Sequence, residues 1–308
     1  MPRHLLVTSA RKLSYADGNI IIERDKDAPP FQFPLEDIDV VLIEEQKAII
    51  TTRLLAEAAK AGTNLIFCGP DYLPIAESSP IMSHYNHSAI VKLQLTQLPY
   101  KRKKFWEYNI KQKIANQIAV LQATVDDDVG IDRLRSYLDA VKPGDETNME
   151  GVAAREYFQA LFGQDFARFS ETPLASALNY GYSIVASCVI RNVAVSGLSD
   201  SIGVWHDAAQ NAHNLSYDLI EPFRQVVDYW VYCNRDSIEF PLSPIQKREL
   251  ISLLDEDIVM CGQHLKLHYA ISQATNAFVS YLKSGSTSDI KMPIYRPGLG
   301  LKRGDDGE

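Results

Sequence analysis

The apolar pattern of this 308-residue chain changes once, at a polar segment around Pro80. Before that segment, short apolar runs are separated by turn residues, which is typical of β-strands. After it, apolar residues recur every three or four positions for roughly two hundred residues, as they do on one face of a helix. The pattern predicts an α+β protein: a small β-rich domain over residues 1–79, a linker over 80–89 and an all-α domain over 90–283.

The β-rich region carries local signals for a hairpin and for one helix. Asp17 and Gly18 suit the type I′ turn of a hairpin, and residues 40–43 and 64–68 are apolar runs typical of buried strands. A helix is expected over 51–61, where Thr side chains can cap it and a following glycine can end it. Because so short a region cannot build a large core, we expect it to bury apolar surface against its own copy in a symmetric dimer.

Composition limits the compartment and the class of protein. No run reaches the roughly 20 consecutive apolar residues of a membrane helix, and no apolar signal region follows the first residues, so a cytoplasmic protein is expected. The four cysteines are scattered singly, which indicates neither a zinc cage nor a disulfide framework. A net charge of -8 argues against a basic nucleic-acid coat protein but says little about local faces. Residues 284–308 are rich in Gly, Ser, Pro and charge, and a flexible tail is expected there.

Glu150 occupies an unusual position for a carboxylate. It lies on the apolar stripe of a helix predicted over 149–162. Its neighbours on that stripe are Ala153, Ala154, Tyr157, Phe158 and Leu161. A buried carboxylate needs a cation or hydrogen bonds in place of water. Glu150 is therefore either a structural carboxylate paired with a nearby Arg or a ligand for a metal ion.

Two later segments offer partners for such an ion. His206 follows a Gly-containing turn and precedes a polar segment, where functional side chains often lie. Asp218 and Glu221 are one helical turn apart and share a face. Pro222 cannot donate to the carbonyl of Asp218, so the backbone is expected to be kinked there. The donors are mainly oxygen, which favours Mg2+ or Mn2+ over Zn2+, and such sites commonly act on phosphates.

Other motifs are better explained by structure than by chemistry. His264 and His268 lack the intervening Glu of a zinc-protease motif and are expected on a polar helix face. His84 and His87 are expected to be solvated or hydrogen-bonded in the linker. Residues 126–128 lack the Gly and Glu of a calcium loop, so they indicate a helix start or a solvated run. The chain has neither a P-loop nor a dinucleotide fingerprint, which disfavours nucleotide-driven chemistry.

Basic residues cluster despite the acidic total. Four basic residues stand in a row, and Lys111 and Lys113 follow further along the same segment. This run either tracks a phosphate backbone or forms a solvated helix end. The four are Lys101, Arg102, Lys103 and Lys104. Three arginines on helices that carry or neighbour the proposed site are better candidates for phosphate contact, although each can instead neutralise a carboxylate. They are Arg155, Arg191 and Arg224.

Taken in order, these segments resemble the CRISPR-associated integrase/endonuclease family, the larger, catalytic subunit of the spacer-acquisition complex. The segments are Asn148-Met149-Glu150-Gly151, Ala177-Leu178-Asn179-Tyr180-Gly181-Tyr182, Ile202-Gly203-x-x-His206, and Asn214-Leu215-x-x-Asp218-Leu219-x-Glu221-Pro222-Phe223-Arg224. Residues 12–15, 51–55, 66–68 and 113–117 also resemble the shorter form found beside type II effector nucleases. The resemblance covers nearly the whole chain except the tail, and it departs over 207–214, where type II relatives tend to be richer in Asn and Phe.

This resemblance implies roles for named residues and partners. Glu150, His206 and Glu221 would bind the divalent metal, with Asp218 and Asn179 as auxiliary positions. It also implies a homodimer formed through the β domain and a helical catalytic domain. Two such dimers would assemble on a central dimer of a small ferredoxin-like partner, giving a heterohexamer that binds a double-stranded DNA fragment and the repeat array, with no membrane involved.

The function expected from residues and resemblance together is metal-dependent DNA integration in CRISPR adaptation. The 3′-hydroxyl of a captured fragment would attack a phosphodiester at a repeat boundary. One alternative is a stand-alone metal-dependent nuclease on branched DNA, with water as the nucleophile. A second alternative is a non-catalytic DNA-binding scaffold subunit whose acidic cluster is structural.

Overall fold

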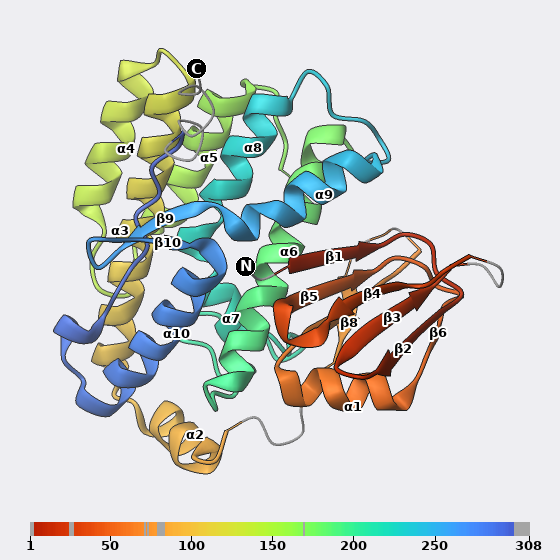
Figure 1. Cartoon of the computed structure of the whole chain (residues 1–308). Helices are drawn as coiled ribbons and strands as arrows, with labels where there is room; N and C mark the ends of the chain where they lie inside the picture. Colours follow the sequence, from red (N-terminus) through yellow and green to blue (C-terminus); the bar gives the residue numbers. More distant parts are fainter. Residues whose placement is uncertain are drawn as a thin grey trace, which may run out of the picture. The chain divides into compact units, whose positions relative to one another are not determined.

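The computed structural model describes residues 3–24, 28–70, 72, 74–78, 84–168 and 170–298. Its backbone separates into two compact units, residues 1–83 and 84–308. The first unit contains the larger β-sheets and the second is mostly helical (Figure 1). The predicted α+β class, with a β-rich part followed by a helical part, is confirmed.

The first unit contains two four-stranded sheets. In one sheet the neighbours are β1 (Arg3–Val7), β5 (Ile38–Ile43), β7 (Asn64–Cys68) and β8 (Pro74–Glu77), the first three parallel and the last antiparallel. In the other sheet they are β4 (Phe31–Pro34), β3 (Asn19–Glu23), β2 (Lys12–Ala16) and β6 (Ile49–Ile50). A short 3-10 helix, η1 (Leu35–Asp37), and α1 (Thr52–Ala61) complete the unit.

The local signals of this unit act as predicted. Asp17 and Gly18 both have positive φ, 49° and 82°, and form the tight turn between β2 and β3. Thr51 accepts a hydrogen bond from the backbone N–H of Leu54 and caps α1, and Gly62 ends that helix in the left-handed conformation. The predicted hairpin and helix are confirmed.

The second unit is built from nine α-helices among the residues that the structure describes. They are α2 (His87–Thr96), α3 (Pro99–Thr124), α4 (Asp128–Ala140), α5 (Met149–Phe162), α6 (Pro173–Val195), α7 (Asn214–Leu219), α8 (Gln225–Asn234), α9 (Pro244–Ser252) and α10 (Leu267–Ser284). Three 3-10 turns accompany them: η2 (Glu221–Phe223), η3 (Leu253–Asp255) and η4 (Thr287–Asp289). Asp127 accepts a hydrogen bond from the N–H of Gly130 at 3.0 Å, which confirms the predicted helix start at 126–128.

Part of the predicted linker is helical. α2 begins at His87, inside the 80–89 segment, because the apolar residues that follow it already have helical spacing. His87 is hydrogen-bonded, as expected, with its Nδ1 3.0 Å from the carbonyl oxygen of Gly197. Residues 80–83 of the predicted linker lie outside the described residues.

A β-hairpin interrupts the helical pattern, so the prediction of an all-α domain is wrong at this point. β9 (Asp257–Met260) pairs antiparallel with β10 (Gln263–Lys266). Between them, Cys261 and Gly262 both have positive φ, 52° and 76°, which gives a two-residue turn. The β-branched residues of β9 favour this extended conformation.

His264 and His268 do not share a helix face, which corrects a second prediction. His264 lies in β10, whereas His268 lies in α10 with its Nδ1 2.8 Å from the carbonyl oxygen of Leu254. The strand ends between the two histidines, so helical spacing does not apply to them.

α6 is a core helix of the second unit. Its length and composition would allow it to cross a membrane, but 67% of the relevant window is buried inside the protein. Buried residues recur along its whole length, from Ala175 to Val193. The apolar character of α6 is therefore accounted for by packing against other helices.

The predicted flexible tail is wrong for its first part. Ile294 and Val259 exchange two backbone hydrogen bonds of 3.0 and 2.7 Å, which adds this segment to β9. The N–H of Tyr295 donates to Oδ1 of Asn116 at 3.1 Å, and the Tyr295 ring is buried. These contacts offset the cost of ordering the chain. Residues 299–308 of the predicted tail lie outside the described residues.

Candidate functional site

Glu150 lies in the first turn of α5, and the predicted helix over 149–162 is confirmed. Asp145 accepts hydrogen bonds from the N–H groups of Met149 and Glu150 at 2.9 and 2.8 Å, which fixes the start of the helix. On the stripe that continues from Glu150, Ala153, Tyr157 and Leu161 are buried, whereas Ala154 and Phe158 are half-buried. The Glu150 side chain itself is 31% exposed, because it stands at the end of that stripe.

Asp218 is the centre of the hydrogen-bond network around His206. Its Oδ1 lies 2.7 Å from Nδ1 of His206, and its two oxygens accept the N–H groups of Val204, Trp205 and His206 at 2.5, 2.9 and 3.1 Å. The carboxylate is completely buried. Because a carboxylate accepts, Nδ1 of His206 carries the proton and Nε2 is left as the acceptor.

The turn before His206 can only be made by glycine at position 203. A Cβ there would lie 2.2 Å from the carbonyl oxygen of His206 and 3.0 Å from Oδ2 of Asp218.

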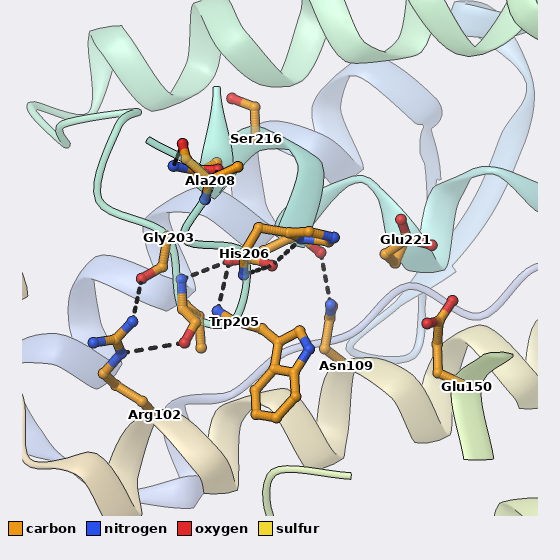
Figure 2. A network of polar contacts seen from close by, with 12 residues as sticks. Arg102, Asn109, Glu150, Gly203, Trp205, His206, Ala208, Ser216 and Glu221 are labelled. Atoms are coloured by element: carbon orange, nitrogen blue, oxygen red, sulfur yellow. Dashed lines mark hydrogen bonds and ion pairs between the residues drawn. The ribbon is translucent and has the colours of Figure 1, made fainter. Parts of the chain in front are cut away.

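The hydrogen bond to Asp218 raises the pKa of His206, and partial burial opposes that shift. The Glu221 and Glu150 carboxylates also raise the pKa of this ring. Figure 2 shows the imidazole directed toward Glu221.

The predicted kink at Pro222 is confirmed and it positions Glu221. α7 ends at Leu219, and Pro222 lies in the 3-10 turn η2. The carbonyl of Asp218, which Pro222 cannot bond, accepts instead from Nδ2 of Asn109 at 2.6 Å. The break keeps the Glu221 side chain buried at the end of α7 and close to α3.

Lys113 of α3 bridges the two candidate glutamates. Its Nζ lies 2.6 Å from Oε2 of Glu221 and also forms an ion pair with Oε1 of Glu150. Burial alone would lower the pKa of Lys113, but the charges of Glu221 and Glu150 outweigh burial and raise it. Lys113 is 8% exposed and therefore does not track a DNA backbone, which corrects its grouping with the surface basic run.

A signal for this buried lysine was present in the sequence. Asn109, Lys113 and Asn116 follow a spacing of four and three residues, so they share one face of α3. All three are buried and each binds the segment around η2 or Glu150. A polar row at helical spacing beside the apolar Ile110 and Ile114 indicates a buried network.

Arg224 completes the charge balance at Glu221. Its Nε lies 3.1 Å from Oε1 of Glu221, and its guanidinium carbon stands 4.8 Å from the centre of the Tyr182 ring. Burial by itself raises the pKa of Glu221, but Arg224 and Lys113 outweigh it and hold the pKa at about 2. Of the two roles expected for Arg224, phosphate contact or neutralising a carboxylate, the structure shows the second, with Glu221 as the carboxylate.

Glu150 and Glu221 line a pocket of about 420 Å³ in the second unit. Its wall combines carboxylates, guanidinium groups and aromatic rings. The lining residues are Lys113, Gln117, Glu150, Ala154, Arg155, Phe158, Gln159, Phe166, Arg168, Tyr182, Glu221, Arg224, Gln225 and Asp228. Such a mixture can accept an anion with an attached apolar group.

Asp228 and Arg168 are pocket residues that sequence reasoning missed. Asp228 accepts hydrogen bonds from the hydroxyl groups of Tyr157, at 3.0 Å, and Tyr182. Burial raises the pKa of Asp228 to about 6, although the two hydroxyl groups and nearby arginines oppose the shift. Arg168 stands over the Tyr182 ring on the same wall and donates to the exposed Asn179 at 2.8 Å. The sequence spacing of these residues follows no recognised motif, so only the fold brings them together.

The other predicted basic residues have mixed positions. Arg155 is exposed and lines the pocket, whereas Arg191 lies nine residues after Tyr182 on α6, outside the pocket lining. Arg102 donates to the carbonyls of Gly203 and Val204 at 2.9 and 3.1 Å, so it supports the turn before His206.

The rest of the basic run makes contacts within the helical unit. Lys103 pairs with Glu146 at 2.6 Å, and Lys104 pairs with Glu107 at 2.8 Å. The backbone carbonyl of Lys101 accepts the Tyr281 hydroxyl at 2.8 Å. Lys103 and Lys104 thus have carboxylate partners within the helical unit, and contact of the run with DNA stays a prediction.

Comparison with known proteins agrees with the predicted resemblance. A family model described as CRISPR associated protein Cas1 matches residues 5–241. The CRISPR-associated endonuclease Cas1 of Neisseria meningitidis serogroup C (strain 8013) is 32% identical over 297 residues, which span 96% of this chain and 97% of that protein.

Solved structures show the same fold. A casposase bound to integration product is similar with a TM-score of 0.75 and 20% identity, over 92% of both chains. A chain of a Cas6-RT-Cas1--Cas2 complex is similar with a TM-score of 0.72 and 18% identity, over 96% of this chain and 36% of that one. The family model and the Neisseria meningitidis relative both match most of the sequence, and this chain therefore belongs to the CRISPR associated protein Cas1 family.

Proposed function

We propose that this Cas1 chain is a metal-dependent DNA integrase of CRISPR adaptation. The 3′-hydroxyl of a captured DNA fragment attacks a phosphodiester at a repeat boundary, a new phosphodiester forms, and the original 3′ oxygen leaves. No high-energy cofactor is needed, because one phosphodiester replaces another. The observation that carries this proposal is the imidazole of His206, held by Asp218 and directed toward Glu221, which Lys113 links to Glu150.

The chemistry of the donors fits a divalent metal. Glu150 and Glu221 supply carboxylate oxygens, and His206 supplies Nε2 because its Nδ1 is bonded to Asp218. The two carboxylates already share one cation, the ammonium group of Lys113, so the protein holds them close enough to serve a common positive charge. Mg2+ or Mn2+ bound by these three residues would stabilise charge on the scissile phosphate and on the departing oxygen.

The remaining residues of the site bind and orient. Asp218 holds the His206 ring in one tautomer and fixes the preceding turn. Arg155 and Arg168 line the pocket beside the carboxylates and can pair with phosphate oxygens of the bound strand. Arg224 keeps Glu221 ionised and therefore competent as a ligand.

We also propose the partners that the resemblance implied. The β-rich unit forms a homodimer, and two dimers assemble on a dimer of a small ferredoxin-like partner in the cytoplasm. Support comes from the fold shared with a Cas6-RT-Cas1--Cas2 complex, and from the fold shared with a casposase bound to integration product.

A strand-transfer assay separates the three candidate functions. Full-length protein is incubated with a double-stranded fragment and a repeat-containing target, with or without the small partner, in Mg2+ or Mn2+ and in EDTA. An integrase joins fragment to target only with metal, and Glu150→Ala abolishes joining. Glu156→Gln on the same helix, whose carboxylate pairs with Arg133, serves as the matched control.

Each other outcome identifies an alternative. Cleavage of branched DNA without joining under any condition indicates a nuclease. DNA binding with neither joining nor cleavage, unaffected by Glu150→Ala, indicates a scaffold subunit. Either result overturns the proposed integrase.

A further inference from the structure

Trp205 presents an exposed indole directly beside His206. The residue is 43% exposed, although large aromatic residues are normally well covered. The ring stacks on Trp106 of α3 with an interplanar angle of 8° and centroids 5.7 Å apart. Trp106 is 2% exposed and stands edge-on to the His206 ring. One aromatic layer is therefore buried, and the second, Trp205, faces solvent.

The position of this indole is fixed by the network that holds His206. The N–H of Trp205 donates to Oδ2 of Asp218 at 2.9 Å, and the N–H of His206 donates to Oδ1 of the same carboxylate at 3.1 Å. The preceding carbonyl of Val204 accepts from Nε of Arg102 at 3.1 Å. Trp205 and His206 are thus held relative to each other by one shared carboxylate.

We propose that Trp205 is a stacking platform for one unpaired base of the DNA strand whose phosphate is held at His206. This proposal rests on the proposed function. The Trp205 and His206 rings both contact Trp106, with ring centroids 5.7 and 6.0 Å from its own, so a phosphate at His206 brings the attached nucleotide within reach of the indole. Bases stack on exposed aromatic rings without regard to sequence. A base inside a duplex is already stacked on both faces, so the platform selects a nucleotide that has left its helix.

Two strands can supply that base, and both have the same chemistry. It comes either from the 3′ end of the incoming fragment or from the target strand at the attacked phosphodiester. We therefore test branched DNA that mimics a half-integrated product, with 2-aminopurine placed singly at each position next to the junction in one strand or the other. The fluorescence of 2-aminopurine is low when the base is stacked.

The variants separate stacking from packing. Trp205→Leu keeps apolar bulk against Trp106 but removes the indole π-system, whereas Trp205→Phe keeps an aromatic ring. Tyr269→Ala, at an exposed ring on α10, is the matched control. Thermal unfolding of each variant establishes that it is folded.

We expect one 2-aminopurine position to be quenched in complexes of the unchanged protein, Trp205→Phe and Tyr269→Ala. The same position should brighten severalfold with Trp205→Leu. Affinity for the branched DNA should fall about tenfold in Trp205→Leu, whereas affinity for a fully paired duplex of equal length should not change. The strand that carries the quenched position identifies the source of the base.

Equal fluorescence at every position in the unchanged protein and in Trp205→Leu, with strand transfer intact, overturns the stacking platform but leaves the integrase proposal standing. An equal loss of affinity for branched and fully paired DNA in Trp205→Leu would show that Trp205 acts in packing, and this result also overturns the stacking platform. If none of the proteins binds or joins DNA, both proposals fail.

Discussion

The Nζ of Lys113 lies 2.6 Å from Oε2 of Glu221, so a buried ammonium group occupies the space that faces a candidate metal ligand. The same nitrogen pairs with Glu150. Bringing two carboxylates together without a cation is unfavourable, because like charges repel at short range and burial removes the water that would screen them. Lys113 therefore stabilises the site in the metal-free protein, and a bound metal ion must share or take over this role.

The Lys113→Met variant should be less stable than the unchanged protein in EDTA. Loss of one partner of a buried ion pair leaves the other charge uncompensated and destabilises by about 3–5 kcal/mol. Added Mn2+ should raise the melting temperature of this variant by more than that of the unchanged protein, because the cation replaces the lost ammonium group. Thermal unfolding with and without Mn2+ measures both effects. Lys111→Met, at a lysine paired with Glu107, is the control, and an equal Mn2+ shift in both variants would contradict the prediction.

The pH dependence of stability should change in Glu221→Gln. The ordinary glutamate pKa of 4.5 is lowered to about 2 in the folded protein, so ionised Glu221 contributes stability that is complete above about pH 4.5. That contribution is lost as the pH falls from about 4.5 toward 2. The difference in unfolding free energy between the unchanged protein and Glu221→Gln should therefore shrink over this interval. Urea unfolding at a series of pH values tests it, and a constant difference would refute the ionised state of this carboxylate.

Asp218→Asn should reduce both stability and strand transfer. The carboxylate accepts three backbone N–H groups and the His206 ring nitrogen, whereas an amide offers one accepting oxygen and turns its own N–H groups toward donors. Unfolding free energy should fall by about 1–3 kcal/mol, the usual cost of unsatisfied buried donors. His206→Ala should abolish strand transfer with a smaller change in stability, since that side chain is 44% exposed. Full stability of Asp218→Asn would show that the turn before His206 does not depend on this carboxylate.

Exposed and paired basic residues should differ in their effect on DNA binding. Arg155 is exposed in the pocket wall and can contact one phosphate. Arg155→Gln should therefore reduce the slope of log affinity against log salt concentration by about 1. Lys103→Gln should leave the slope nearly unchanged, because Lys103 pairs with Glu146. Fluorescence anisotropy over a range of salt concentrations gives both slopes. If Lys103→Gln lowers the slope as much as Arg155→Gln, the basic run contacts DNA after all.

The protein should be a dimer at micromolar concentration. The β-rich unit contains fewer than 90 residues and two small sheets, which limits the apolar area that it can bury alone. Multi-angle light scattering measures the mass, and the dimer should persist in high salt because apolar burial does not depend on screening. A monomer at all concentrations would exclude the proposed homodimer.

Several elements were determined by the sequence through signals between near neighbours. The Asp17-Gly18 turn, the Thr51 cap and the helix that begins at Met149 all depend on residues within about one turn of each other. Pro222 likewise predicted a break in the helix. Proline has no N–H to donate to the carbonyl of the residue four positions before it, here Asp218. The resemblance to the CRISPR-associated integrase/endonuclease family rested on motifs that can be read in the same linear way, and the comparisons confirmed it.

The tertiary structure alone decided which distant groups share one environment. Lys113 and Glu150 are 37 positions apart, and Asn116 and Tyr295 are 179 positions apart, yet each pair is in direct contact. The spacing of Lys113 with Asn109 and Asn116 marks a polar face of α3, but only packing against α5 and η2 makes Lys113 the counter-ion of Glu150 and Glu221. The ordered segment around Ile294 has no periodicity, because two bonds to Val259 stabilise it rather than any helix of its own. Local backbone preferences act through neighbours in the sequence, whereas burial and pairing of charge depend on the packing of the whole unit.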